Sequence, residues 1–87
     1  MSLISKFNGS LNVVGKYVKE YRIKRGFSYE ELSAKLELMG ISIHKQSLYD
    51  IENDRRTVKD YELYGLARVL KIDMNDLFVG MRSNFKE

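Results

Sequence analysis

The chain has 87 residues, of which 44% are hydrophobic and 31% are charged, so it can close one modest core and not two. The absence of cysteine excludes disulfides and thiolate metal sites, and a single histidine cannot supply the other common ligand sets, so no metal or other cofactor is expected. Zero prolines and six glycines favour long helices with short connections, and a net charge of +3 permits a polyanionic partner without requiring one.

The first helix is predicted within residues 11–25. Val14 and Val18 recur at a spacing of four, as in the apolar stripe of an amphipathic helix. Gly26 is expected to end this helix, because glycine readily adopts the left-handed conformation found just past a helix C-terminus. Residues 1–10 end in the turn-forming sequence Asn-Gly-Ser and are interpreted as an N-terminal appendage.

A second helix is predicted over residues 29–39. Ser28 and Glu31 have the spacing of a capping box, in which each side chain accepts a hydrogen bond from the backbone N–H of the other residue. Gly40 is expected to end the helix. The side chains predicted to face the core are Leu32, Leu36 and Met39.

A third amphipathic helix is predicted over residues 45–53. Ser42 or His44 is expected to cap it. Leu48 and Ile51, three residues apart, are its predicted buried pair, and the opposite face of the helix is polar.

Two further helices complete the predicted fold. Thr57 and Asp60 have the spacing of an N-cap pair for the fourth helix, and Asp73 is expected to cap a short fifth helix that runs through Leu77 and Phe78. The wide apolar face of the fourth helix consists of Tyr61, Leu63, Leu66, Ala67 and Leu70. These elements predict an all-α fold, a compact bundle of about five short helices.

Two of these helices, joined by a connection that contains glycine, have the arrangement of a helix-turn-helix, in which the second helix enters the DNA major groove. Four motifs follow in order: Arg22-x-x-x-Gly26-Phe27-Ser28-x-Glu30-Glu31-Leu32, Ile51-Glu52-Asn53-x-Arg55-Arg56, Leu63-x-x-Leu66-Ala67-x-x-Leu70 and Ile72-x-Met74-x-x-Leu77-Phe78. Through them the chain resembles the lambda-repressor and Cro type of helix-turn-helix, also called the xenobiotic-response-element family. The resemblance implies a bundle of about five helices that binds operator DNA, usually as a dimer, and represses or activates transcription. Residues 11–79 are therefore predicted to be the DNA-binding domain, followed by a C-terminal tail, residues 80–87.

The resemblance implies that the third helix is the recognition helix. The residues implied to read bases are Lys45, Gln46, Tyr49 and Asp50. Gln46 is chemically the best suited, because an amide can pair bidentately with adenine, although a solvated polar face is the alternative interpretation. Asp50 also has two interpretations: its carboxylate accepts from a cytosine amine, or it accepts from Gln46 one helical turn earlier.

The resemblance also implies contacts to the phosphate backbone. The residues involved are Ser28, Tyr29, Ser47, Asn53, Arg55 and Arg56. Arg22 and Glu52 match a family pair that joins the first helix to the end of the third, and they are predicted to form a partly buried, structural ion pair. The connection before the third helix is longer than the shortest family turns, so the second helix is expected to be one turn longer.

Two functional hypotheses follow. The first is a sequence-specific regulator that binds double-stranded DNA as a homodimer, most simply a repressor. The alternative is a protein-interaction module, such as an antitoxin, that binds a partner protein through an apolar run at either end of the chain. The residues of these runs are Leu77, Phe78, Met81 and Phe85 near the C-terminus, which are also the expected dimer surface, and Leu3, Ile4 and Phe7 near the N-terminus.

Other function classes are not expected. Ser42, His44 and Asp50 have the residue types of a hydrolase triad, but neighbouring positions on one connection and helix provide no pocket or oxyanion hole, so the chain is not predicted to be an enzyme. The apolar runs are far shorter than the roughly eighteen residues of a membrane span, and no signal peptide is recognisable. A cytoplasmic location without membrane contact is therefore expected.

Overall fold

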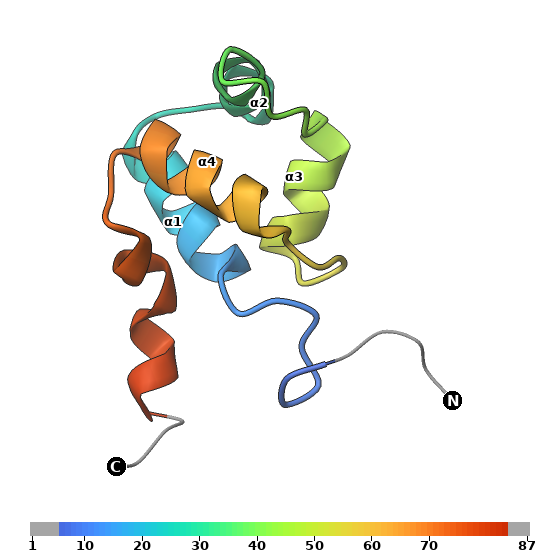
Figure 1. Cartoon of the computed structure of the whole chain (residues 1–87), viewed down its shortest axis with the longest axis vertical. Helices are drawn as coiled ribbons and strands as arrows, with labels where there is room; N and C mark the ends of the chain where they lie inside the picture. Colours follow the sequence, from blue (N-terminus) through green and yellow to red (C-terminus); the bar gives the residue numbers. More distant parts are fainter. Residues whose placement is uncertain (1–5, 84–87) are drawn as a thin grey trace.

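Five helices follow one another along residues 6–83, the part of the chain that the structure, a computed structural model, describes (Figure 1). They are α1 (Gly15–Lys24), α2 (Tyr29–Glu37), α3 (Lys45–Glu52), α4 (Asp60–Leu70) and the 3-10 helix η1 (Met74–Ser83). Residues 6–83 contain no strand, and only an isolated bridge joins Phe7 to Ser10 around the predicted turn. The predicted all-α bundle of five short helices is confirmed.

Local sequence signals set both ends of α2. The Ser28 Oγ accepts a hydrogen bond from the Glu31 N–H at 3.1 Å, and the Glu31 carboxylate accepts one from the Ser28 N–H at 3.0 Å. This is the predicted capping box. Gly26 and Gly40 have φ angles of 74° and 79° just beyond α1 and α2, in the left-handed region that favours glycine, as predicted.

The first helix begins later than the sequence suggested. The Asn12 Oδ1 accepts hydrogen bonds from the N–H groups of Val14 and Gly15, at 3.1 and 2.8 Å. These bonds hold the preceding backbone in a turn, because an asparagine side chain competes with the helix for backbone donors. The helix therefore begins at Gly15 and not near residue 11.

The predicted side-chain caps of α3 and α4 are wrong. His44 occupies the N-cap of α3, but no side chain there makes a capping hydrogen bond. Thr57 lies outside α4, whose N-cap is Lys59. The Glu62 carboxylate accepts from the Lys59 N–H at 2.9 Å, so α4 is capped by an acid inside its first turn and not by a side chain before it.

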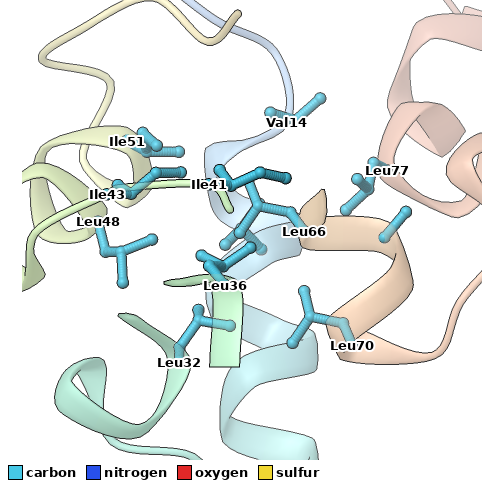
Figure 2. Close-up of a cluster of buried hydrophobic side chains, with 12 residues drawn as sticks. Val14, Leu32, Leu36, Ile41, Ile43, Leu48, Ile51, Leu66, Leu70 and Leu77 are labelled. Carbon is cyan, nitrogen blue, oxygen red and sulfur yellow. The ribbon is translucent and has the colours of Figure 1, made fainter. Parts of the chain in front are cut away.

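The core lies where the helices meet (Figure 2). Its buried side chains are Val14, Val18, Leu32, Leu36, Ile41, Ile43, Leu48, Ile51, Leu66, Ala67, Leu70 and Leu77. Burial of each leucine or isoleucine stabilises the fold by roughly 1.5–3 kcal/mol. Met39 was predicted to join this core but is 40% exposed, because α2 ends before it.

The connection between α2 and α3 differs from the prediction. The second helix ends at Glu37 and is not a turn longer, so the extra residues lengthen the connection instead. Ile41 and Ile43 in this connection are buried in the core. The Ser33 Oγ donates a hydrogen bond of 2.6 Å to the Ile43 carbonyl oxygen, which fixes the connection against α2. Apolar anchors thus replace the extra turn of helix.

The described part of the C-terminal apolar run is only partly accessible. Leu77 is fully buried and is not available to a partner, whereas Phe78, which packs against the core, and Met81 are half-buried. Asp73 acts as expected at the start of η1: its carboxylate accepts from the Asn75 N–H at 2.8 Å. The predicted boundary between residues 79 and 80 falls inside η1. Leu3, Ile4 and Phe85 lie outside the described residues.

Candidate nucleic-acid interface

One face of α3 is polar and turned away from the core. Leu48 and Ile51 are fully buried and attach the helix to the core, as predicted. Gln46 and Tyr49 are exposed, and Asp50 is half-buried beside them. Figure 1 shows α3 at one edge of the bundle. A two-turn helix held in this way presents its polar face to an external partner.

Only weak contacts hold the side chains of Lys45, Gln46 and Asp50 within residues 6–83. The Gln46 Nε2 donates to the Asp50 Oδ1 at 3.2 Å, which is the second of the two interpretations of Asp50. The Lys45 Nζ lies 3.3 Å from the Glu30 Oε1, and both side chains are largely exposed. Exposed pairs of this kind contribute about 0–1 kcal/mol, so an external ligand can replace them.

The N-terminus of α2 is already occupied by the chain itself. The Ser28 N–H donates to the Glu31 carboxylate, and the Ser28 hydroxyl accepts from the Glu31 N–H. The Ser28 hydrogen bonds hold the pKa of the Glu31 carboxyl below its usual value. A phosphate at this position therefore has to displace an acid, whereas Ser47, half-buried on α3, makes no such competing contact within residues 6–83.

Tyr29, predicted to contact a phosphate, points its hydroxyl inward. The hydroxyl donates to the Glu52 Oε1 at 2.8 Å, and the Arg22 Cζ lies 4.1 Å from the centroid of the Tyr29 ring. Burial, followed by the hydrogen bond to Glu52, raises the pKa of the Tyr29 hydroxyl above its ordinary value. The side chain is part of the internal polar network.

Arg22 and Glu52 form the centre of that network. The Arg22 Nε lies 2.7 Å from the Glu52 Oε2, and a second guanidinium nitrogen lies 3.2 Å from Oε1. A third nitrogen donates to the Phe27 carbonyl oxygen at 2.9 Å. The Glu52 side chain is fully buried and that of Arg22 is 12% exposed. The hydrogen bond to Glu52 raises the pKa of Arg22. The predicted ion pair is therefore present and ties α1 to the end of α3.

Three polar residues follow α3 and have different environments. Arg55 is exposed, has no carboxylate partner within residues 6–83, and lies with its Cζ 5.5 Å from the centroid of the Tyr49 ring. Arg56 instead donates two hydrogen bonds, of 3.2 and 3.0 Å, to the buried carboxylate of Glu62. The Asn53 Nδ2 donates to the Tyr49 carbonyl oxygen at 2.8 Å. Of the two arginines, only Arg55 has a guanidinium without an acidic partner in the described chain.

Two positioning residues were missed by the sequence interpretation. Asp54 has a φ of 58°, and its Oδ1 accepts from the N–H groups of Leu11 and Asn12 at 2.8 and 3.0 Å. The Asn12 Nδ2 donates to the carbonyl oxygens of Ile51 and Arg56, at 3.0 and 2.9 Å. The segment before α1 thus holds the loop after α3 (Figure 1). The Asn-Asp dipeptide after α3 is a turn signal that could have indicated the loop conformation, but not its distant partner.

Other kinds of site are not indicated in the described part of the chain. No group of three or more His, Cys, Asp or Glu side chains within residues 6–83 could hold a metal ion. None of the helices there has the length and apolar character needed to cross a bilayer.

The comparisons agree with this geometry. A helix-turn-helix family model (HTH_3) matches residues 18–77, which is more than half of the chain. The fold is similar to that of SinR, the master regulator for biofilm formation, in a crystal structure with DNA; the TM-score is 0.63 and the identity 29%, over 75% of this chain and 97% of that one. A complex of SinR with SinI gives a TM-score of 0.63 and 25% identity, over 85% of this chain and 68% of that one. No curated protein is similar enough in sequence to count as a relative. With the polar face of α3 turned away from the core of a five-helix bundle, the chain belongs to the lambda-repressor/Cro-type helix-turn-helix family of non-enzymatic, DNA-binding transcription regulators.

Proposed function

We propose that the protein is a sequence-specific transcriptional repressor that reads the DNA major groove with α3. The observation that carries this proposal is the division of α3 into a buried apolar face, Leu48 and Ile51, and an outer polar face. An α-helix presented in this way fits the width of the major groove. Repression would follow from occupancy alone, because a protein bound over a promoter excludes other proteins from it.

Base reading is assigned to Lys45, Gln46 and Asp50. Tyr49 shares this face of α3 and is assigned no base contact. The Gln46 amide suits adenine, and the Asp50 carboxylate suits the cytosine amine. Because Gln46 and Asp50 hydrogen-bond each other in the structure, DNA binding exchanges one weak contact for contacts to bases. The exchange is favourable only for a sequence that satisfies both side chains, which is a source of specificity.

Phosphate contact is assigned mainly to Arg55, with Asn53 and Ser47. Arg55 has no carboxylate to compete with a phosphate in the described chain. Three other residues predicted for this role already have an acidic partner inside the chain: Arg56 has Glu62, Tyr29 has Glu52, and Ser28 has Glu31. Their contribution to DNA binding is therefore proposed to be secondary.

A homodimer on a palindromic operator completes the proposal, since one domain of this size reaches only a half-site. DNA as the partner also agrees with the predicted cytoplasmic location. Protein binding is a second candidate function. It is favoured by the similarity to SinR, which is known in a complex with SinI, and by the exposed apolar residues of η1, Met74 and Val79.

The decisive experiment is selection of binding sequences from random duplex DNA, followed by a footprint. We expect one enriched, roughly palindromic sequence. Gln46→Ala should weaken binding to that sequence by about 1–3 kcal/mol and leave binding to random DNA almost unchanged, because a lost base contact is a sequence-dependent loss.

Asp50→Asn is the companion variant. It removes a negative charge, so non-specific binding should strengthen, while the preference at one base pair should change. If both variants select the same sequences as the wild type, α3 is not the reading surface, and the protein-binding candidate becomes the better one.

A further inference from the structure

Two tyrosines connect the buried ion pair to the exposed Arg55. The rings of Tyr29 and Tyr49 meet edge to face, with centroids 6.2 Å apart and an interplanar angle of 76°. This is the arrangement that the charge distribution of aromatic rings favours. Tyr29 lies at the start of α2 and Tyr49 in the middle of α3, so the contact also joins the two helices of the motif.

The inner ring is fixed by three contacts. The Tyr29 hydroxyl donates to Glu52, Arg22 lies over the ring face, and the ring packs edge to face with that of Tyr49. Glu52 is itself held by Arg22, so the position of the Tyr29 ring is set by the rigid centre of the fold. A half-buried side chain with this many partners has little rotational freedom.

The outer ring carries Arg55. Its guanidinium carbon lies 5.5 Å from the centroid of Tyr49, within the range of a cation–π contact. The Arg55 N–H also donates to the Asp50 carbonyl oxygen at 2.7 Å, so both backbone and side chain are held near α3. The Tyr49 hydroxyl makes no hydrogen bond within residues 6–83, which leaves its ring as the part that contacts a neighbour.

We propose that Tyr29 and Tyr49 form an aromatic brace that holds the Arg55 guanidinium in place for a DNA phosphate. Tyr49 is then a positioning residue and not a base reader. A guanidinium held over a ring by a cation–π contact uses none of its N–H donors in hydrogen bonds to that ring, so a phosphate oxygen can accept them. Ordering this long side chain before binding lowers the entropic cost of the contact. The inference rests on the proposed function, because it concerns how the same surface binds DNA.

The test is a double-mutant cycle with Tyr49→Leu and Arg55→Gln, measured as affinity for random duplex DNA over a range of salt concentrations. Tyr49→Leu should weaken binding roughly two- to fivefold, the size of an exposed cation–π contact. Arg55→Gln should lower the salt slope by about one. In the Arg55→Gln background, Tyr49→Leu should have no further effect, because the brace acts only through Arg55.

Two conservative variants and one control sharpen the cycle. Tyr49→Phe keeps the ring and should bind as the wild type does. Tyr29→Phe releases the inner ring from Glu52 and should weaken binding by a smaller, equally Arg55-dependent factor. Tyr64→Leu removes a similar ring, which lies 5.9 Å from the Arg68 guanidinium on α4, and should leave DNA binding unchanged.

Three outcomes would overturn the brace. These are an equal loss from Tyr49→Leu in both backgrounds, a change of base preference in Tyr49→Phe, and no loss at all. A measurement without DNA separates this inference from the proposed function: side-chain NMR signals of Arg55 should show an upfield ring-current shift that disappears in Tyr49→Leu. If the wild-type chain shows this shift but binds no duplex DNA, the proposed function and the phosphate role of Arg55 are both refuted. If it binds DNA normally without the shift, only the brace is refuted.

Discussion

Arg55 and Arg56 carry the same charge at neighbouring positions, yet their surroundings give them different roles. Arg56 is paired with Glu62, whose side chain is only 4% exposed, while Arg55 lies on an aromatic ring at the surface. An arginine whose donors already satisfy a buried carboxylate stabilises the fold, and one without such a partner can bind an external anion. Residue type alone does not distinguish the two cases.

The two arginines should therefore separate binding from stability. Arg55→Gln is expected to weaken binding to all DNA sequences and to lower the free energy of unfolding by at most about 1 kcal/mol, the size of an exposed cation–π contact. Arg56→Gln leaves Glu62 without its guanidinium and should destabilise the fold by about 1–3 kcal/mol. Urea unfolding and salt-dependent DNA titrations on both variants check this, and the reverse assignment of effects would contradict the structure.

The pair of Arg22 and Glu52 should show strong coupling in a double-mutant cycle. Replacing either residue by Met leaves its partner without compensation and should cost roughly 3–5 kcal/mol, whereas the double replacement should recover much of that loss. Arg22→Met should be the more harmful of the two near neutral pH, because the Glu52 side chain is the one that is fully buried. Denaturant melts give the free energy of unfolding of the wild type, the two single variants and the double variant. Small, additive losses would show that the two side chains interact as an exposed pair does.

At the scale of elements, the loop after α3 depends on the segment before α1. Asp54 adopts a positive φ and accepts two backbone N–H groups, from Leu11 and Asn12. The hydrogen bond from the Asn12 N–H, and to a smaller extent that from the Leu11 N–H, holds the pKa of the Asp54 carboxyl below its ordinary value. A group with a depressed pKa in the folded state stabilises the fold above its unfolded pKa, and this stabilisation is lost as the pH falls through the folded pKa.

Asp54 should therefore contribute to the acid sensitivity of the protein below about pH 4, near the ordinary pKa of an aspartate. Asp54→Asn keeps an acceptor oxygen and tolerates the positive φ, but it cannot titrate. We expect its stability to fall less steeply than that of the wild type between about pH 4 and pH 2. Urea melts at several pH values test this, and parallel curves for the two proteins would argue against a role for Asp54.

Local signals explain which elements were predictable. The Ser28 capping box and the glycines after α1 and α2 act within a few residues, so the sequence alone indicated them correctly. The Thr57 cap of α4 was mispredicted because the position of Glu62, which accepts from the Lys59 N–H, also depends on Arg56, a partner outside α4. The burial of Leu77 depends on how η1 packs against the other helices. At the candidate site, the sequence identified the polar face of α3, but the inward turn of Tyr29 is set by three elements that meet only in the folded chain.

At the scale of the whole molecule, α3 and η1 lie on opposite sides of the bundle (Figure 1). A surface on η1 would therefore leave α3 accessible to DNA. Its exposed apolar side chains are Met74 and Val79, which are 36% and 48% exposed. Met74 and Val79 are not part of the predicted C-terminal run, but because Leu77 of that run is buried, they are the exposed apolar side chains of η1 that we propose to meet a second copy.

Binding to a duplex with two half-sites about one helical turn apart, roughly 34 Å, should be cooperative, with two chains per duplex. Val79→Glu should reduce that cooperativity and leave binding to a single half-site unchanged. Leu38→Glu is the matched control, because Leu38 is 89% exposed but lies just after α2, away from η1. Light scattering and titrations on both duplexes measure the effect. A monomer on the two-half-site duplex would refute dimeric binding.

The Asn12 side chain helps to fix the conformation of the loop that contains Arg55, although the two residues are about half the chain apart in sequence. Its bonds to the carbonyl groups of Ile51 and Arg56 span 39 and 44 positions of sequence. These bonds hold a segment that precedes α1 and lies outside the helices, so they should open early on warming. Amide protons of Leu11 and Asn12 should then exchange with solvent through a local opening that leaves α2 and α4 intact. DNA bound at Arg55 would slow that exchange. The hydrogen-exchange rate of these two amides would therefore measure how much DNA is bound at the loop.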